Sequence, residues 1–366
     1  MKFRSERDLL VEALSAASRV VATRLVGATS GILLSLTNNQ LTVTGTDLDI
    51  TVRSVVDVIG IEDGAVVVPA RLIVDAVRSL EAGAVTVAAQ DENVELSLGR
   101  AKFSLRTFAV VDYPNLPPVT GAVMTTPALD LIQGINQVVR AAASDDARPL
   151  LTGVLFTTEN GDLRLIATDS YRLAVRDVPG VRDLVGSHDV LVPARALQEL
   201  QRAAASLVAD SEIGVTLTDA EISFVVGRTS ISSRLIDGNY PSVLQLIPAS
   251  YPNQLRVAKD TLLTSLRRAK LLAKDSTSSV RLSMQDKNVE IRTQSHDAGD
   301  VEDNVDADYV GEELTIAFNP NFLIDGIEAV YGDEIILEMS DSVRPAMVHG
   351  VEDTRFRYLL MPVRVQ

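Results

Sequence analysis

The 366-residue sequence contains no cysteine and no tryptophan, and it contains three histidines. The absence of cysteine excludes disulfide bonds, thiol catalysis and thiolate metal ligands. His188, His296 and His349 form no His-x-x-x-His pair, so a zinc site would need unusual ligands. No apolar run approaches the roughly 20 residues of a membrane-spanning helix, and the charged N-terminus lacks a signal-peptide core. These absences predict a cytoplasmic protein without metal, cofactor or membrane contact.

Motifs of the common enzyme classes are also missing. There is no G-x-x-x-x-G-K-[ST] phosphate loop, no G-x-G-x-x-G dinucleotide motif and no G-x-S-x-G nucleophile. The acidic segment from Asp297 to Asp308 lacks the central glycine and the final glutamate of an EF-hand loop. A solvated or charge-matching surface explains that segment better. The sequence therefore predicts a protein that is not an enzyme.

Three repeats, each about a third of the chain long, organise the sequence. One amphipathic helix is predicted after each of Ser5, Thr126 and Asp260, with N-caps at Ser5 and Thr126. A second helix is predicted after a strand that ends near each of three prolines, Pro69, Pro193 and Pro320. Alternating apolar and polar segments between the helices predict antiparallel strands.

The predicted fold class is therefore α+β, with three tandem domains of helices packed on antiparallel sheets. Proline-rich stretches near Pro117 and Pro248 mark the boundaries. The predicted domains are residues 1–120, 121–250 and 251–366.

Charge is distributed unevenly. The net charge of −15 at first argues against a nucleic-acid partner. However, the six helical windows together carry +4, so the rest of the chain carries −19. Arg71 and Arg195 each follow a helix-opening proline by two residues, and Arg267, Lys270 and Lys274 share one helix face. The basic side chains of these helices either lie on an ordinary solvated surface or contact DNA phosphates without sequence preference.

A family resemblance rests on motifs along the whole chain. They are Thr44-Gly45-Thr46-Asp47-Leu48, Val68-Pro69-Ala70-Arg71, Asp112-Tyr113-Pro114-Asn115-Leu116, Ala167-Thr168-Asp169, and Tyr358 to Pro362 with Arg364. In this order and spacing, they resemble the bacterial β sliding clamps, the processivity subunits of DNA polymerase III. The resemblance implies a non-catalytic homodimer, a six-domain ring that encircles double-stranded DNA.

The resemblance also implies a peptide-binding groove between domains 2 and 3. Replicative DNA polymerase, clamp loader, and repair or translesion proteins would dock there through short peptides. The implied groove residues are Leu151, Thr168, Ser170, Tyr171, Arg172, Leu173, Pro241, Leu246, Leu359, Leu360, Met361, Pro362, Val363 and Arg364. The apolar members would form the pocket, and Arg172 and Arg364 would form a polar rim.

Two further sites follow from the same resemblance. The implied ring interface brings together Arg100, Lys102, Phe103, Leu105, Leu271, Leu272, Asp300, Glu302 and Asp303. There, Arg100 and Lys102 would face the acidic residues across the subunit boundary. The implied DNA contacts are Arg24, Arg71 and Arg195, and the helix-face residues Arg267, Lys270 and Lys274 complete the predicted DNA surface. The alternative is a peptide-binding scaffold that does not contact DNA.

Overall fold

The structure is a computed structural model, and it describes all residues except 22–25, 146, 183, 187, 209, 274–278, 296–298 and 365–366. The first repeat comprises β1 (Lys2–Glu6), α1 (Arg7–Val20), β2 (Gly31–Thr37), β3 (Gln40–Thr46), β4 (Ile50–Asp57), β5 (Ile59–Glu62), β6 (Gly64–Pro69), α2 (Ala70–Ser79), β7 (Ala84–Gln90), β8 (Asn93–Leu98) and β9 (Ala101–Arg106).

The middle and last repeats follow the same order without a counterpart of β5. The middle repeat comprises β10 (Val123–Pro127), α3 (Ala128–Val138), β11 (Gly153–Glu159), β12 (Asp162–Thr168), β13 (Arg172–Arg182), β14 (Val190–Pro193), α4 (Ala194–Ala203), β15 (Glu212–Leu217), β16 (Glu221–Val226) and β17 (Thr229–Arg234). The last repeat comprises β18 (Asn253–Ala258), α5 (Lys259–Lys270), β19 (Val280–Gln285), β20 (Asn288–Ser295), β21 (Gly299–Val310), β22 (Leu314–Phe318), α6 (Pro320–Ala329), β23 (Glu334–Met339), β24 (Ala346–Gly350) and β25 (Phe356–Leu360). The prediction of three α+β repeats is confirmed.

Antiparallel pairing joins strands of different repeats into common sheets. The strand orders are β5-β1-β7-β8-β9, β10-β15-β16-β17-β4-β3-β2-β6, and β14-β11-β12-β13-β25-β24-β23-β18-β21-β20-β19-β22. We call the β4–β17 pairing the first junction and the β13–β25 pairing the second junction. Because each junction is a backbone ladder, its register fixes which side chains stand opposite one another.

Two compact units result from this pairing: residues 1–129 with 195–235, and residues 130–194 with 236–366. The first unit contains the five- and eight-stranded sheets, and the second contains the twelve-stranded sheet. The middle repeat is divided because each of its two sheets continues into a different neighbour. The domain limits 1–120, 121–250 and 251–366 therefore stay a prediction.

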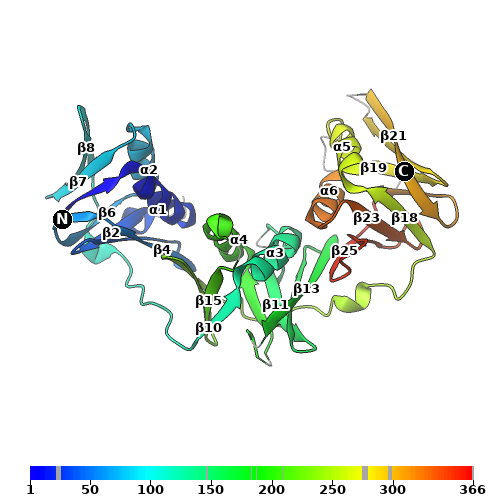
Figure 1. Ribbon diagram of the computed structural model, residues 1–366, viewed down its shortest axis with the longest axis horizontal. Coiled ribbons are helices and arrows are strands. Elements are labelled where there is room, and N and C mark those ends of the chain that lie inside the picture. The colour runs from blue at the N-terminus through cyan, green and yellow to red at the C-terminus, as the bar shows by residue number, and fades with distance from the viewer. Residues whose placement is uncertain are drawn as a thin grey trace. The chain divides into compact units, whose positions relative to one another are not determined.

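The core of the first repeat lies between its helices and two sheets. Helices α1 and α2 pack together against the strands, as Figure 1 shows near the N-terminus. Leu10 and Leu14 of α1 and Ile73 of α2 are buried there with Phe3. Gly45 of β3 lies directly under the backbone of α1, so any side chain at this position would collide with the helix.

Both predicted side-chain N-caps are wrong. Helix α1 begins at Arg7 without a side-chain cap, and the hydroxyl of Ser5 donates to the Glu6 carbonyl instead. Thr126 belongs to β10, and its buried hydroxyl has no hydrogen-bond partner among the described residues. In both repeats the strand runs directly into the helix, because Glu6 and Pro127 are still paired in the ladder. No helix of the described part of the chain is long and apolar enough to span a bilayer.

Candidate functional site

A fixed loop connects β12 to β13 at the second junction. One carboxylate oxygen of Asp169 accepts the backbone N–H of Tyr171 at 2.9 Å and that of Arg172 at 3.0 Å. The Thr168 hydroxyl donates to the Arg172 carbonyl at 2.6 Å and accepts the N–H of Ser170 at 3.1 Å. Ser170 has a positive φ of 79°, which these bonds stabilise. The loop therefore projects the Tyr171 side chain outward.

The C-terminal segment runs past this loop. The Met361 N–H donates to the Tyr171 carbonyl at 2.9 Å, which extends the β13–β25 ladder by one bond. The Val363 N–H then donates to the Ala317 carbonyl at 2.8 Å. These bonds place Met361 beside the loop and Val363 beside β22 (Leu314–Phe318).

A buried apolar cluster lies beneath the loop and the tail. It consists of Leu155, Ile166, Leu173, Val175, Leu191, Val243, Met347 and Leu359, with Leu150, Ile236, Tyr240, Ile247 and Tyr251 packed around it. The hydroxyl of Tyr251 has no partner among the described residues, and burial raises its pKa to about 12. Sequence analysis identified only Leu173 and Leu359 of this cluster, because the others come from strands that give no local signal of a shared site.

The predicted groove residues divide by exposure. Tyr171, Leu246 and Met361 are 64%, 56% and 43% exposed, and Pro241, Ser170 and Arg364 are also on the surface. Pro362 and Val363 are half-buried, whereas Leu151, Thr168, Leu173, Leu359 and Leu360 are buried. Leu360 is fully buried and, by strand alternation, faces away from Leu359. Leu360 therefore supports the strand and presents no surface to a ligand.

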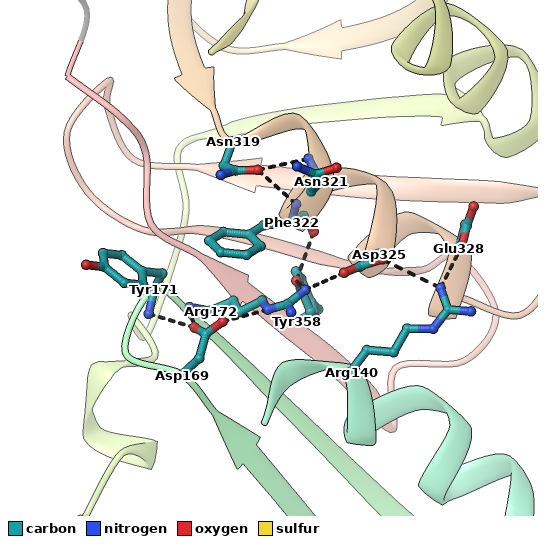
Figure 2. Close-up of polar contacts among 10 residues, drawn as sticks. All are labelled: Arg140, Asp169, Tyr171, Arg172, Asn319, Asn321, Phe322, Asp325, Glu328 and Tyr358. Carbon is teal, nitrogen blue, oxygen red and sulfur yellow. Dashed lines mark hydrogen bonds and ion pairs between the residues drawn. The ribbon is translucent and has the colours of Figure 1, made fainter. Parts of the chain in front are cut away.

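The expectation that Arg172 forms a polar rim is wrong. Its side chain is 10% exposed, and its guanidinium contacts Asp169 at 2.9 Å and Asp325 of α6 at 2.6 Å (Figure 2). The Tyr358 hydroxyl lies 3.4 Å away, and the guanidinium lies 4.4 Å from the centre of the Phe322 ring. Burial opposes the charge of Arg172, but these neighbours outweigh burial and raise its pKa. Arg172 therefore joins the middle repeat to the last repeat.

Phe322 is a site residue that sequence analysis missed. Its ring is stacked on the Tyr171 ring with a centroid distance of 6.3 Å, and Arg172 covers it as well (Figure 2). The Asn319 side chain caps α6 by accepting the N–H groups of Asn321 and Phe322. The Asn319-Pro320 helix start was visible in the sequence, but the contact of its first turn with Tyr171 was not.

Two of the predicted DNA-contacting side chains already pair with carboxylates. Arg195 lies 2.9 Å from Asp47, and Arg267 lies 2.9 Å from Glu328. Glu328 also pairs with Arg140 at 2.7 Å, and hydrogen bonds from both arginines lower its pKa. These pairs reduce the positive potential of the helices.

Of the remaining predicted DNA-contacting residues, the structure describes Arg71 and Lys270. Arg71 is exposed and lines a cleft between α1 and α2 with Arg19 and Arg78. Lys270 is exposed on α5. Arg24 and Lys274 lie outside the described residues.

The predicted interface residues lie on the strands β9 and β21, in the turn before β9 and near the end of α5. Leu271 is 69% exposed, Leu272 and Phe103 are half-buried, Arg100 is exposed, and Leu105 is buried in the core of the first repeat. Lys102 pairs with Glu95 at 2.7 Å. Glu302 pairs with Arg292 at 2.6 Å, and Asp303 pairs with Arg268 at 2.8 Å. The expectation that these acids face Arg100 and Lys102 of a second copy stays a prediction.

Comparison with protein families accounts for nearly the whole chain. Models of the DNA polymerase III beta subunit match its N-terminal domain at residues 1–117, its central domain at 126–242 and its C-terminal domain at 244–364. The chain belongs to the DNA polymerase III beta subunit family. It is 32% identical to the beta sliding clamp of Streptomyces coelicolor and 31% identical to that of Escherichia coli, with each chain fully covered.

Solved structures of family members share the fold over the full length. The sliding clamp of Bartonella birtlesii, determined with bound griselimycin, is 28% identical with a TM-score of 0.91, and both chains are fully covered. The clamp of Bacillus subtilis is 29% identical with a TM-score of 0.87 over both full chains. Membership of this family and the match in fold assign the chain the function of a sliding clamp.

Proposed function

We propose that two copies of this chain form a closed ring of six repeats that encircles duplex DNA. The ring tethers the replicative DNA polymerase and other DNA-processing proteins to the template and catalyses no reaction itself. It acts in the cytoplasm. Sequence-independent retention on DNA then follows from ring closure, since the chain carries a net charge of −15.

The ring proposal rests on the strands β9 and β21, each of which has an edge that is unpaired over most of its described length. Strands β4, β13 and β21 occupy equivalent positions in the three repeats, as do β17, β25 and β9. Two of the three possible junctions form within the chain, β4–β17 and β13–β25. Within the described residues β9 pairs along its length only with β8, and β21 pairs with β18 only over residues 307–310. Pairing of β9 with β21 of a second copy would complete the third junction and close the ring.

The partner-binding groove lies on the second junction. Tyr171, Leu246 and Met361 are exposed and belong to the segments that supply Leu173, Ile247 and Leu359 to the buried apolar cluster. Their side chains support binding of a short peptide with apolar anchors. The loop bonds of Asp169 hold Tyr171 in place before a peptide arrives, which lowers the entropy cost of binding.

Sedimentation equilibrium at micromolar concentration tests the ring. We expect twice the chain mass of 39.4 kDa. The variant Phe103→Asp introduces a charge on β9 at the proposed interface. It is therefore expected to sediment as the monomer. Thr315→Asp, on the exposed surface of β22, is the matched control. A monomeric native chain would contradict the ring.

Retention on DNA separates the clamp from a scaffold that binds only peptides. Clamps assembled by a clamp loader on a nicked plasmid should co-elute with the circle and leave after the plasmid is linearised. Peptide binding should be the same before and after linearisation. Equal retention on circular and linear DNA would refute encirclement, and absence from both would favour the scaffold.

A further inference from the structure

A cavity of about 720 Å³ lies beside the first junction, within the first unit. Its walls are α1, the last half of β4, the turn between β16 and β17, and the C-terminal end of α4 with the residues that follow. This volume lies within the range of about 300–1,000 Å³ that is typical of small-molecule sites.

The cavity exists because small residues occupy the junction at this level. Ser54 of β4 stands opposite Thr229 of β17, with their hydroxyl oxygens 3.0 Å apart, and both line the cavity. In the second junction the same register position holds Arg176 opposite Phe356. Arg176 is 6% exposed and pairs with Asp353 at 2.5 Å, and Phe356 is 1% exposed. The two large side chains fill the space that the two hydroxyl side chains leave open.

Apolar side chains form most of the cavity lining. Ala13 and Ala16 of α1, Val52 and Val56 of β4, and Leu207 and Ile231 from the middle repeat contribute to it. Leu9 is 50% exposed and extends the apolar lining to the edge of the cavity. An apolar body placed here would contact two repeats at once.

At one edge of the cavity the positive side chains outnumber the negative ones. Arg19 and Arg202 both pair with the single buried carboxylate of Glu199, Arg19 at 2.8 Å. Glu199 and Arg202 are the sixth and ninth residues of α4, and the same positions of α6 hold Asp325 and Glu328. In the second junction Asp325 and Glu328 are two carboxylates shared by Arg140, Arg172 and Arg267, whereas in the first junction position 202 adds a guanidinium, and Arg19 and Arg202 share the one carboxylate of Glu199.

The other charged residues of the cavity do not cancel this local excess. Arg228 and Asp57 pair with each other at 2.5 Å. Glu12 precedes Arg19 by seven residues on α1, which is about 10 Å along the helix. The end of the cavity at Arg202, which is half exposed, therefore carries a local positive charge, and the Glu12 end would repel a second anion.

We propose that this cavity, which we name the junction cavity, binds a small amphipathic molecule with an apolar body and one oxyanion. The apolar body lies between α1 and β4, and the oxyanion takes the free hydrogen-bonding capacity of Arg202. The proposal does not depend on ring closure or on the peptide groove, because every lining residue belongs to the first unit.

The probe is 8-anilinonaphthalene-1-sulfonate, which has an aromatic body and one sulfonate, and the full chain is titrated by fluorescence. We expect one site per chain. Thr229→Phe copies the residue of the second junction and fills the cavity, so it should weaken binding at least about tenfold. Arg202→Glu copies Glu328 and should weaken binding by a similar factor, whereas Arg202→Lys should retain it.

Two controls make the result specific. Val225→Phe adds the same side chain on the exposed face of the adjacent strand and should leave binding unchanged. N-phenyl-1-naphthylamine has the aromatic body without the sulfonate, so it should respond to Thr229→Phe but not to Arg202→Glu. Near-ultraviolet circular dichroism reports whether each variant is folded, and Ser54→Leu replaces Thr229→Phe if that variant does not fold. Unchanged dye affinity in a folded cavity-filling variant, or equal loss in Val225→Phe, would overturn the proposal.

Discussion

At the first junction Arg234 donates its N–H to the Asp49 carbonyl at 2.9 Å, and at the second junction Met361 donates to Tyr171 at the same distance. The backbone geometry is the same, but the side chains differ. Asp49 and Arg234 are exposed and oppositely charged, 3.9 Å apart, whereas Tyr171 and Met361 are apolar. The equivalent position therefore holds a solvated ion pair in one junction and exposed apolar side chains in the other.

Farther along the same ladders, the first junction has a cavity where the second junction has large buried side chains. The second junction is filled by Arg176 and Phe356, whereas the first junction leaves the junction cavity above Ser54 and Thr229. The first junction thus has an ion pair at one end and a cavity at the other, whereas the second has exposed apolar side chains at one end and buried large side chains at the other. Equivalent backbone positions in the two junctions therefore carry different side chains and present different surfaces.

Loss of the Arg172 guanidinium should have the largest effect. Arg172→Leu leaves the Asp169 carboxylate without its buried partner and leaves Asp325 with Arg140 alone. We therefore expect the free energy of unfolding to fall by about 3–5 kcal/mol. Ile50 occupies the same register position in the first junction, and Ile50→Leu should cost less than about 1.5 kcal/mol. Urea unfolding followed by circular dichroism measures both. Similar losses in the two variants would show that Arg172 is not the joining residue.

Removal of an exposed groove side chain should come next. Met361→Ala should weaken binding of a fluorescein-labelled clamp-binding peptide about tenfold, because the peptide loses an apolar contact. Arg234→Ala changes the equivalent residue of the first junction and should leave this affinity unchanged. Fluorescence anisotropy gives both values, and an equal response would place the groove elsewhere. Leu173→Ala is unsuited to this test, because Leu173 is buried and its loss would destabilise the cluster.

Acid should weaken the second junction through Asp353. Burial alone would raise the pKa of Asp353, but hydrogen bonds from Arg355 and Arg176 lower it from 3.8 to about 2. The stabilisation is therefore complete above pH 3.8 and is lost as the pH falls through about 2. The difference in stability between the native chain and Asp353→Asn should shrink over that interval. Val226→Ala removes a buried, uncharged side chain at the end of β16 in the first unit, so its loss of stability should not depend on pH.

The smallest effect is expected for an exposed ion pair. Arg195→Ala removes a pair with Asp47 in which the arginine is 63% exposed, so unfolding free energy should fall by less than about 1 kcal/mol. Differential scanning calorimetry with and without 0.5 M salt would measure it, and salt should reduce the difference further. A large or salt-independent loss would show that this pair supports the first unit.

Sequence patterns predicted the repeats well but not the contacts between them. The helix-opening prolines gave the beginnings of α2, α4 and α6 to within a residue, because proline fixes φ locally. Ser5 and Thr126 failed as caps, because strand pairing to distant residues held their backbone extended. Arg172 was placed on the surface, because its partner Asp325 is 153 residues away in the chain.

Residue counts likewise describe the charge of the helices only in part. The sequence alone determined that the six helices are less acidic than the rest of the chain, since that follows from residue counts. Only the tertiary structure decided that Arg195 and Arg267 meet carboxylates, which weakens the potential those counts predicted.

The sequence by itself determined the three repeats, the helix positions and the family, because periodicity, proline and local motifs act over short separations. Tertiary structure alone decided that Tyr171 stacks on Phe322, that Arg172 is buried and that Ser54 and Thr229 border a cavity. The physical reason is register: strands from different repeats pair over long separations, and that pairing determines which side chains meet.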